Sequence, residues 1–112
     1  MTAQRLSMLA RDALAAGATS ADGFTAFVTQ RAPDLSNEAK ALGDLVARGL
    51  VAPLDNDAIA PQEDVPIAAD LSSRLGVPLT SAQAAITAAR LLSEGGQVGG
   101  SVPSPTQQPY VP

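Results

Sequence analysis

The sequence predicts an all-α domain, a small bundle of about five short helices, followed by an extended C-terminal arm. Apolar residues recur at spacings of three and four along most of the first 94 residues, which is the pattern of helices with one buried face. Glycine and proline separate these periodic segments. The last eighteen residues contain four Gly, four Pro and no charged side chain, so they cannot join a helical core. We therefore divide the chain into a helical domain, residues 1–94, and an arm, residues 95–112.

The first two helices have the clearest patterns. Residues 3–16 place Leu and Ala at helical spacing and are followed by a glycine, which is the usual residue after a helix end. Ser20 is a good N-cap for a second helix that ends before Pro33, because proline disfavours helical geometry in the residue before it. Phe24 and Phe27 lie in this helix and are two of the three aromatic residues, so we expect them at the centre of the core.

The middle of the chain is less regular. A third helix is predicted from about Ser36 to Gly49, with apolar residues along one face. Residues 50–60 contain two short apolar runs around an Asp-Asn-Asp turn, which allows a minor β-hairpin near this position. Pro53 would restrict such a hairpin to an edge pairing, because proline has no N–H to donate to a strand ladder. Residues 61–65 are acidic and are predicted to form a loop.

Two further helices complete the predicted domain. Pro66 is suited to the first turn of a fourth helix, which ends at Gly76. Thr80 and Gln83 have the spacing of a capping box, which predicts that a fifth helix starts there and runs to about Ser93. The Gly-Gly pair that follows is predicted to end this helix and to begin the arm.

The composition excludes several kinds of chemistry. The chain has no Cys, which rules out disulfides and thiol nucleophiles, and no His, which removes the usual general base and metal ligand. We therefore predict that the protein is not an enzyme and has no catalytic residues, cofactor, metal or small-molecule substrate. A net charge of −4 gives no general attraction to nucleic acid or to anionic membranes. Arg11 and Asp12 interrupt the first apolar run, so we expect no signal peptide and an intracellular (cytoplasmic) or virion location.

Residues 67–92 carry a pattern with a different functional meaning. It consists of Leu71, Leu75, Gly76, Val77 and Ile86. These residues resemble the buried positions and the turn glycine of a helix-turn-helix unit, which would imply a DNA-binding regulator or adaptor. Residues 39–60 resemble, more loosely, a recognition helix that enters a wing. The fifth helix offers Gln83, Thr87 and Arg90 for contacts to DNA, which is a small supply of cations for phosphate recognition.

Four carboxylates follow one another between the third and fourth predicted helices. They are Asp55, Asp57, Glu63 and Asp64. Their order invites comparison with a calcium-binding EF-hand loop, but Ile59 stands at its fifth position, Ala60 replaces its glycine and Pro66 replaces its final Glu. We interpret the segment as a solvated acidic turn rather than a metal site.

The arm is the clearest functional feature of the sequence. Its prolines favour an extended polyproline II conformation, in which ten residues span about 30 Å. A glycine-rich hinge precedes this span, and Tyr110 and Val111 are placed as end anchors. The predicted partner-binding residues are Val102, Pro103, Pro105, Pro109, Tyr110 and Val111.

Body and arm together predict a protein that works by contact with other subunits. Ala supplies 22 of the apolar residues, so the body buries little area per residue and gains from burial against neighbours. We predict a non-enzymatic structural or assembly protein, an accessory subunit that docks on a larger homo- or hetero-oligomeric complex through its helical body and its arm. A head, connector or tail component of a phage virion is one such protein. The alternative is the helix-turn-helix DNA-binding regulator or adaptor.

Overall fold

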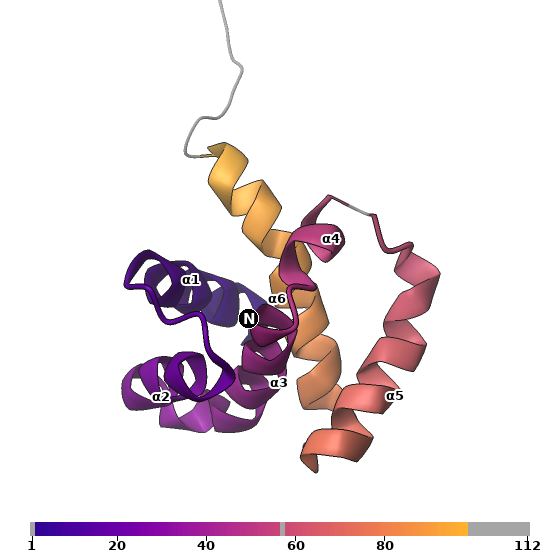
Figure 1. The fold of residues 1–112 in the computed structure, drawn as a ribbon, viewed down its shortest axis with the longest axis horizontal. Coiled ribbons are helices and arrows are strands. Elements are labelled where there is room, and N and C mark those ends of the chain that lie inside the picture. Colours follow the sequence, from indigo (N-terminus) through magenta and orange to yellow (C-terminus); the bar gives the residue numbers. More distant parts are fainter. Residues whose placement is uncertain (1, 57, 99–112) are drawn as a thin grey trace, which may run out of the picture.

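The computed structural model describes residues 2–56 and 58–98, and this part of the chain forms six α-helices and no strand (Figure 1). The all-α prediction is therefore confirmed. Residues 99–112, which make up most of the predicted arm, lie outside the described residues. The helices are α1 (Thr2–Ala15), α2 (Ala21–Arg31), α3 (Ser36–Ala47), α4 (Val51–Asp55), α5 (Asp64–Leu75) and α6 (Leu79–Val98), with short 3-10 turns at Pro33–Leu35 and Pro61–Glu63.

α6 is the central helix of the fold. It packs against α1, α3, α4 and α5, while α2 packs chiefly on α3 and α1. In the view of Figure 1, the first three helices lie on one side of α6, and α4 and α5 lie on the other. The buried side of α6 consists mostly of small residues, which lets four helices approach it closely. These residues are Ser81, Ala82, Ala85, Ile86, Ala88, Ala89 and Leu92.

The ends of the early helices follow the predicted local chemistry. The backbone N–H of Gly23 donates to Ser20 Oγ at 3.0 Å, so Ser20 caps α2 as predicted. At the end of α3, Gly49 adopts the left-handed conformation, with a φ of 73°. This conformation lets the N–H of Leu50 donate to Leu45 O at 2.9 Å, which satisfies a carbonyl that the helix end would otherwise leave unpaired.

The hairpin predicted near residues 50–60 is wrong, because Val51–Asp55 form the short helix α4. Pro53 lies in the first turn of this helix, where its missing N–H costs nothing because first-turn N–H groups have no helical partner. Leu54 is fully buried against the core. The apolar run therefore folds as a helical turn that inserts one leucine, and not as an edge strand.

The last two helices also differ from the predicted boundaries. α5 begins at Asp64, within the segment predicted as a loop. α6 begins at Leu79, so Thr80 is its second residue and not a capping residue. Gly95 and Gly96, which were predicted to end the last helix, lie within α6, which runs to Val98.

The core has one large aromatic residue at its centre. Phe24 is fully buried, whereas Phe27, predicted to share that position, is half-buried at the edge of the core. Gly43 of α3 lies directly against α2, since a Cβ atom at this position would be 3.0 Å from the backbone oxygen of Ala21. Absence of a side chain at Gly43 is therefore what allows α2 and α3 to pack this closely.

Candidate protein-contact surfaces

The connection between α5 and α6 has the local form of a helix-turn-helix joint. Gly76 ends α5 in the left-handed conformation, with a φ of 70°, and α6 begins at Leu79 after two intervening residues. Val77 is buried beneath the turn, and Ser72 Oγ donates to Val77 O at 2.7 Å, which fixes the turn to α5. Leu71 and Ile86 are buried, as the sequence pattern predicted.

The cations beside this joint are engaged with carboxylates. Arg74 Nη2 lies 2.9 Å from Asp44 Oδ2 and 2.9 Å from Asp70 Oδ2, while Arg48 Nε donates to Asp44 Oδ2 at 2.8 Å. The hydrogen bond from Arg74 holds the pKa of Asp70 below its usual value, and the bonds to Asp44 and Asp70 raise the pKa of Arg74. This ion-pair cluster joins α3 to α5, so its arginines are committed to helix packing.

Arg90 of α6 has a structural position that the sequence did not reveal. Sequence reasoning assigned it to an exposed helix face, but its side chain is only 18% exposed. The guanidinium donates to Leu54 O at 3.0 Å and to Ile59 O at 3.2 Å, and its Nη2 lies 2.6 Å from Asp64 Oδ1. Arg90 thereby connects α6 with the end of α4, the following loop and the start of α5.

Arg90 binds one of the four carboxylates that the sequence places in the predicted acidic turn. Asp64 pairs with Arg90, while Asp57 lies outside the described residues. Among the residues that the structure describes, no group of three or more carboxylates is placed to hold a metal ion.

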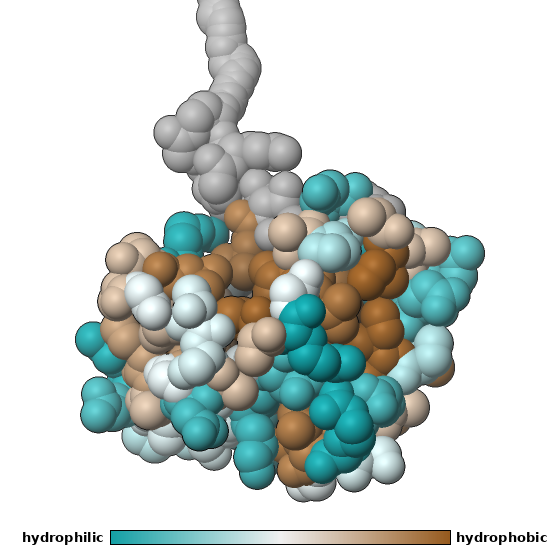
Figure 2. All heavy atoms as spheres, in the orientation of Figure 1, coloured by the Kyte–Doolittle hydropathy of each residue, from teal (hydrophilic) through white to brown (hydrophobic). Residues whose placement is uncertain are grey.

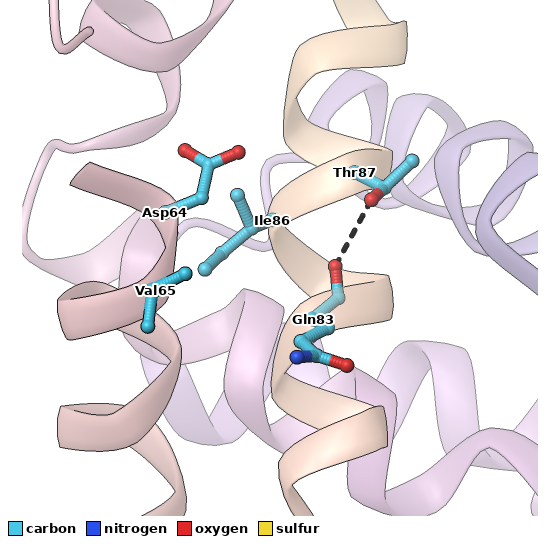
Figure 3. Close-up of a pocket in the computed structure, with 5 residues that line it drawn as sticks. All are labelled: Asp64, Val65, Gln83, Ile86 and Thr87. Carbon is cyan, nitrogen blue, oxygen red and sulfur yellow. Dashed lines mark hydrogen bonds between the residues drawn. The ribbon is translucent and has the colours of Figure 1, made fainter. Parts of the chain in front are cut away.

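A small pocket of about 160 Å³ opens between α5 and α6 (Figure 3). Val65 of α5 and Ile86 of α6 point toward one another across it, and Thr87 Oγ1 donates to Gln83 O at 3.1 Å along its side. Leu79, Gln83 and Thr87 are spaced by four residues and therefore share one face of α6. We call Val65, Leu79, Gln83 and Thr87 the α5/α6 surface.

The four residues of the α5/α6 surface are uncharged, and two of them are exposed aliphatic side chains. Val65 is 72% exposed and Leu79 is 47% exposed. Asp64 also lines the pocket, but its charge is paired with Arg90. On the face drawn in Figure 2, hydrophobic residues also reach the surface in the region of α4 and α5. Ile59 and Ile67 are half-buried at the edge of the core. The second half of the body therefore presents apolar area to its surroundings.

A second hollow, of about 250 Å³, lies between α1 and the end of α2. Met8, 62% exposed, stands in it beside the half-buried Leu9. Arg31 lies on the α2 side, with its guanidinium carbon 3.6 Å from the centre of the Phe27 ring. We call this hollow the α1/α2 groove; it is lined by Arg5, Met8, Leu9, Asp12, Arg31 and Ala32.

A third hollow, of about 410 Å³, lies along α2 beside α3 and the end of α5. Small residues of α2 form most of its lining, and Lys40 and Asp44 stand at its α3 side. Thr29 Oγ1 is buried there without a hydrogen-bond partner, the one such side-chain atom among the described residues. We have no physical account of this unpaired hydroxyl.

The predicted arm residues cannot be compared with these surfaces, because Val102, Pro103, Pro105, Pro109, Tyr110 and Val111 all lie outside the described residues. Within the described ranges, no helix is both long enough and apolar enough to cross a membrane. No family model matches the chain, and neither a curated protein nor a solved structure matches it significantly.

Proposed function

We propose that this chain is a non-enzymatic assembly protein, an accessory subunit that docks on a larger complex through its helical body and its C-terminal arm. The α5/α6 surface carries the proposal. It holds Val65 and Leu79, two of the three large hydrophobic side chains that are exposed in the described part of the chain. An exposed apolar side chain at the edge of a pocket, as Val65 is here, is a feature of protein-contact sites.

The charged groups support the same function. Arg48, Arg74 and Arg90, with their carboxylate partners, hold the helices of the body together. The described hollows are lined largely by small and aliphatic side chains, which supply shape for a protein partner. In its finer form the proposal is a head, connector or tail component of a phage virion, which the small helical body and the proline-rich arm suit.

The test is whether the chain migrates with a larger complex in cells that produce it. Tagged wild type should elute from size-exclusion chromatography of a fresh extract far above the 11.3 kDa of the free chain. Val65→Glu should elute as the free chain, because it puts an unpaired charge on the contact surface. It should still fold, since an acidic residue is favourable in the first turn of α5.

Gln30→Glu is the matched control, because it adds the same single charge at an exposed position of α2. This variant should co-elute with the complex, as wild type does. Elution of the wild-type chain as a monomer from its own cells would contradict an assembly function.

A helix-turn-helix regulator or adaptor is the second candidate, favoured by the joint at Gly76. Gln83 and Thr87 are exposed on α6, where they can contact base edges. An electrophoretic shift assay with duplex DNA at low salt tests this candidate, because non-specific affinity is strongest there. Binding that is weakened by Gln83→Ala would favour it over the assembly function, and no shift would remove it.

A further inference from the structure

We propose that the α1/α2 groove binds Tyr110 of a second copy of this chain. The inference rests on the proposed function, because it assumes that the protein works by contact through its arm. The inference adds to that function a partner, which is another molecule of the same chain, and the two sites in contact, which are Tyr110 and the α1/α2 groove.

The apolar wall of the groove fits an aromatic ring. Met8 is 62% exposed although it is one of the largest apolar side chains in the body, and Leu9 and Ala32 lie beside it. The thioether of methionine makes favourable contacts with aromatic rings, and its unbranched side chain adapts to their shape. Binding of a ring would remove Met8 from water.

The opposite wall supplies a planar cation. One face of the Arg31 guanidinium covers the Phe27 ring, and Arg31 Nη1 donates to Phe27 O at 3.2 Å, so the group is held in one orientation. Arg31 is otherwise exposed and lines the groove. A guanidinium stacks well on aromatic faces. A second ring against its outer face would complete a ring–guanidinium–ring stack.

The arm has one residue that matches this site. Tyr110 is the sole aromatic side chain of residues 99–112, and it carries a hydroxyl that can bond to a charged group at the rim, such as Asp12. The arm has no charged side chain, so neither Arg5 nor Asp12 repels its side chains. An anchor with an apolar ring and a polar tip suits a groove with an apolar floor and charged edges.

The position from which the arm starts is compatible with a groove on another molecule. The last turns of α6 project beyond the other helices in Figure 1, so the arm begins outside the body that carries the groove. Tyr110 follows Val98 by twelve residues, and at about 3.1 Å per residue a segment of that length would reach at most about 37 Å in the polyproline II conformation. Two chains that each place Tyr110 in the other's groove form a closed, symmetric pair with two such contacts.

The protein carries its own probe for this contact. It has one Tyr and no Trp, so its intrinsic fluorescence comes from Tyr110 alone. Acrylamide quenching of the Tyr110 fluorescence of the full chain should fall as protein concentration rises. It should fall in parallel with the increase in the dimer fraction, measured by analytical ultracentrifugation. Met8→Ala removes the methionine–ring contact at both sites of the symmetric pair. It should therefore raise the dissociation constant about 25-fold, the square of the roughly fivefold loss expected for one such contact.

Val65→Ala is the matched control, since Val65 is as exposed as Met8 but lies on the α5/α6 surface. It should leave both the quenching and the dissociation constant unchanged. Arg31→Lys should weaken the protection of Tyr110, because an ammonium group keeps the charge but cannot stack as a plane. Circular dichroism should show the same helicity for all three variants, since each replaces an exposed side chain.

Mixing two variants distinguishes a partner's groove from the chain's own. Tyr110→Ala keeps the groove and lacks the anchor, while Met8→Glu keeps the anchor and carries a damaged groove. Neither variant by itself should show a protected tyrosine, because Tyr110→Ala has no tyrosine and Met8→Glu has no intact groove. The mixture should protect Tyr110 of the Met8→Glu chain from acrylamide quenching. That result is expected only when an arm enters the groove of another molecule.

Three results would overturn the inference. Protection that does not depend on concentration would place the arm in its own groove. Full exposure of Tyr110 at all concentrations would remove the contact, and equal effects of Met8→Ala and Val65→Ala would place it elsewhere. None of them affects the proposed function, which fails separately if the wild-type chain elutes as a monomer from its own cells.

Discussion

Two helix contacts in this protein are held together by different interactions, one mainly by apolar packing and the other with the help of hydrogen bonds and ion pairs. α2 meets α3 through apolar packing, with Phe24 and Leu42 fully buried and Gly43 removing the side chain that would separate the helices. α5 meets its neighbours through smaller side chains: Ala68 and Leu71 are buried, and Ile67 and Leu75 are half-buried at the edge of the core. Directed polar contacts supplement this packing: Arg74 reaches Asp44 of α3, and Arg90 of α6 reaches Asp64.

The difference between the two contacts follows from the alanine-rich composition. Burial stabilises in proportion to apolar area, and an alanine contributes a single methyl group. Where the chain supplies aromatic and leucine side chains, area alone holds the helices together. Where it supplies alanine, hydrogen bonds and ion pairs must fix the position of the helix. The α5 contact should therefore respond to pH and to single polar substitutions, and the α2–α3 contact should not.

The largest effect is expected at the apolar contact. Phe24→Ala removes a fully buried ring and should lower the free energy of unfolding by about 3–5 kcal/mol, from lost burial and the cavity left behind. Chemical denaturation measures it. Phe27→Ala is the control, because this ring is half-buried and partly covered by Arg31, and its cost should be clearly smaller. Equal costs for the two variants would mean that the aromatic centre of the core is misplaced.

An intermediate effect is expected at the polar contact. Arg90→Leu leaves Leu54 O, Ile59 O and Asp64 without the guanidinium, and should lower the free energy of unfolding by about 1.5–3 kcal/mol, the range for hydrogen bonds to charged groups. Amide hydrogen exchange should speed up in α4 and α5 and change little in α2 and α3.

Arg90→Lys separates the charge of this residue from its shape. Lysine keeps the pairing with Asp64 but cannot reach two backbone oxygens and a carboxylate at once, so its exchange rates should lie between those of wild type and Arg90→Leu. Wild-type exchange in Arg90→Lys would show that the forked geometry is unimportant and that charge alone positions α5.

The same contrast explains which parts of the fold were predictable. Ser20, Gly49 and Gly76 act through bonds to residues a few positions away, so their roles can be read from the local sequence. The helix α4 (Val51–Asp55) could not be predicted in this way, because residues 50–60 are compatible locally with a strand or a helical turn. Burial of Leu54 against residues distant in the sequence decides between them.

The candidate surfaces were predictable only in part. The turn at Gly76 and its buried neighbours follow from a local pattern, and the structure contains both. The position of Arg90 follows from a meeting of α6 with Leu54 and Asp64, which lie 36 and 26 residues away in the sequence. No local signal distinguishes such an arginine from an exposed one. The α1/α2 groove was not predictable for the same reason, because Arg31 lines it together with residues of α1 that are distant in the sequence.

The smallest effect is expected in the pH dependence of the ion-pair cluster. The hydrogen bond from Arg74 holds the pKa of Asp70 below the ordinary value of 3.8 that it has in the unfolded chain. The unfolded chain therefore binds this proton at a higher pH than the folded chain, and stability rises with pH through that window. The contribution of Asp70 is present above pH 3.8 and is lost as the pH falls through the lower, folded value. Because the pair is exposed, salt should weaken the effect.

Thermal melts between about pH 2 and pH 6 measure this effect. Asp70→Asn should make the melting temperature depend less on pH at the acid end than it does in wild type. Asp34→Asn should do the same, since Arg5 lowers the pKa of Asp34 in the same way. Hydrogen exchange separates them, because only Asp70 should loosen α5 at low pH. If acid loosens α5 equally in wild type and Asp70→Asn, protonation of Asp70 is not what releases that helix.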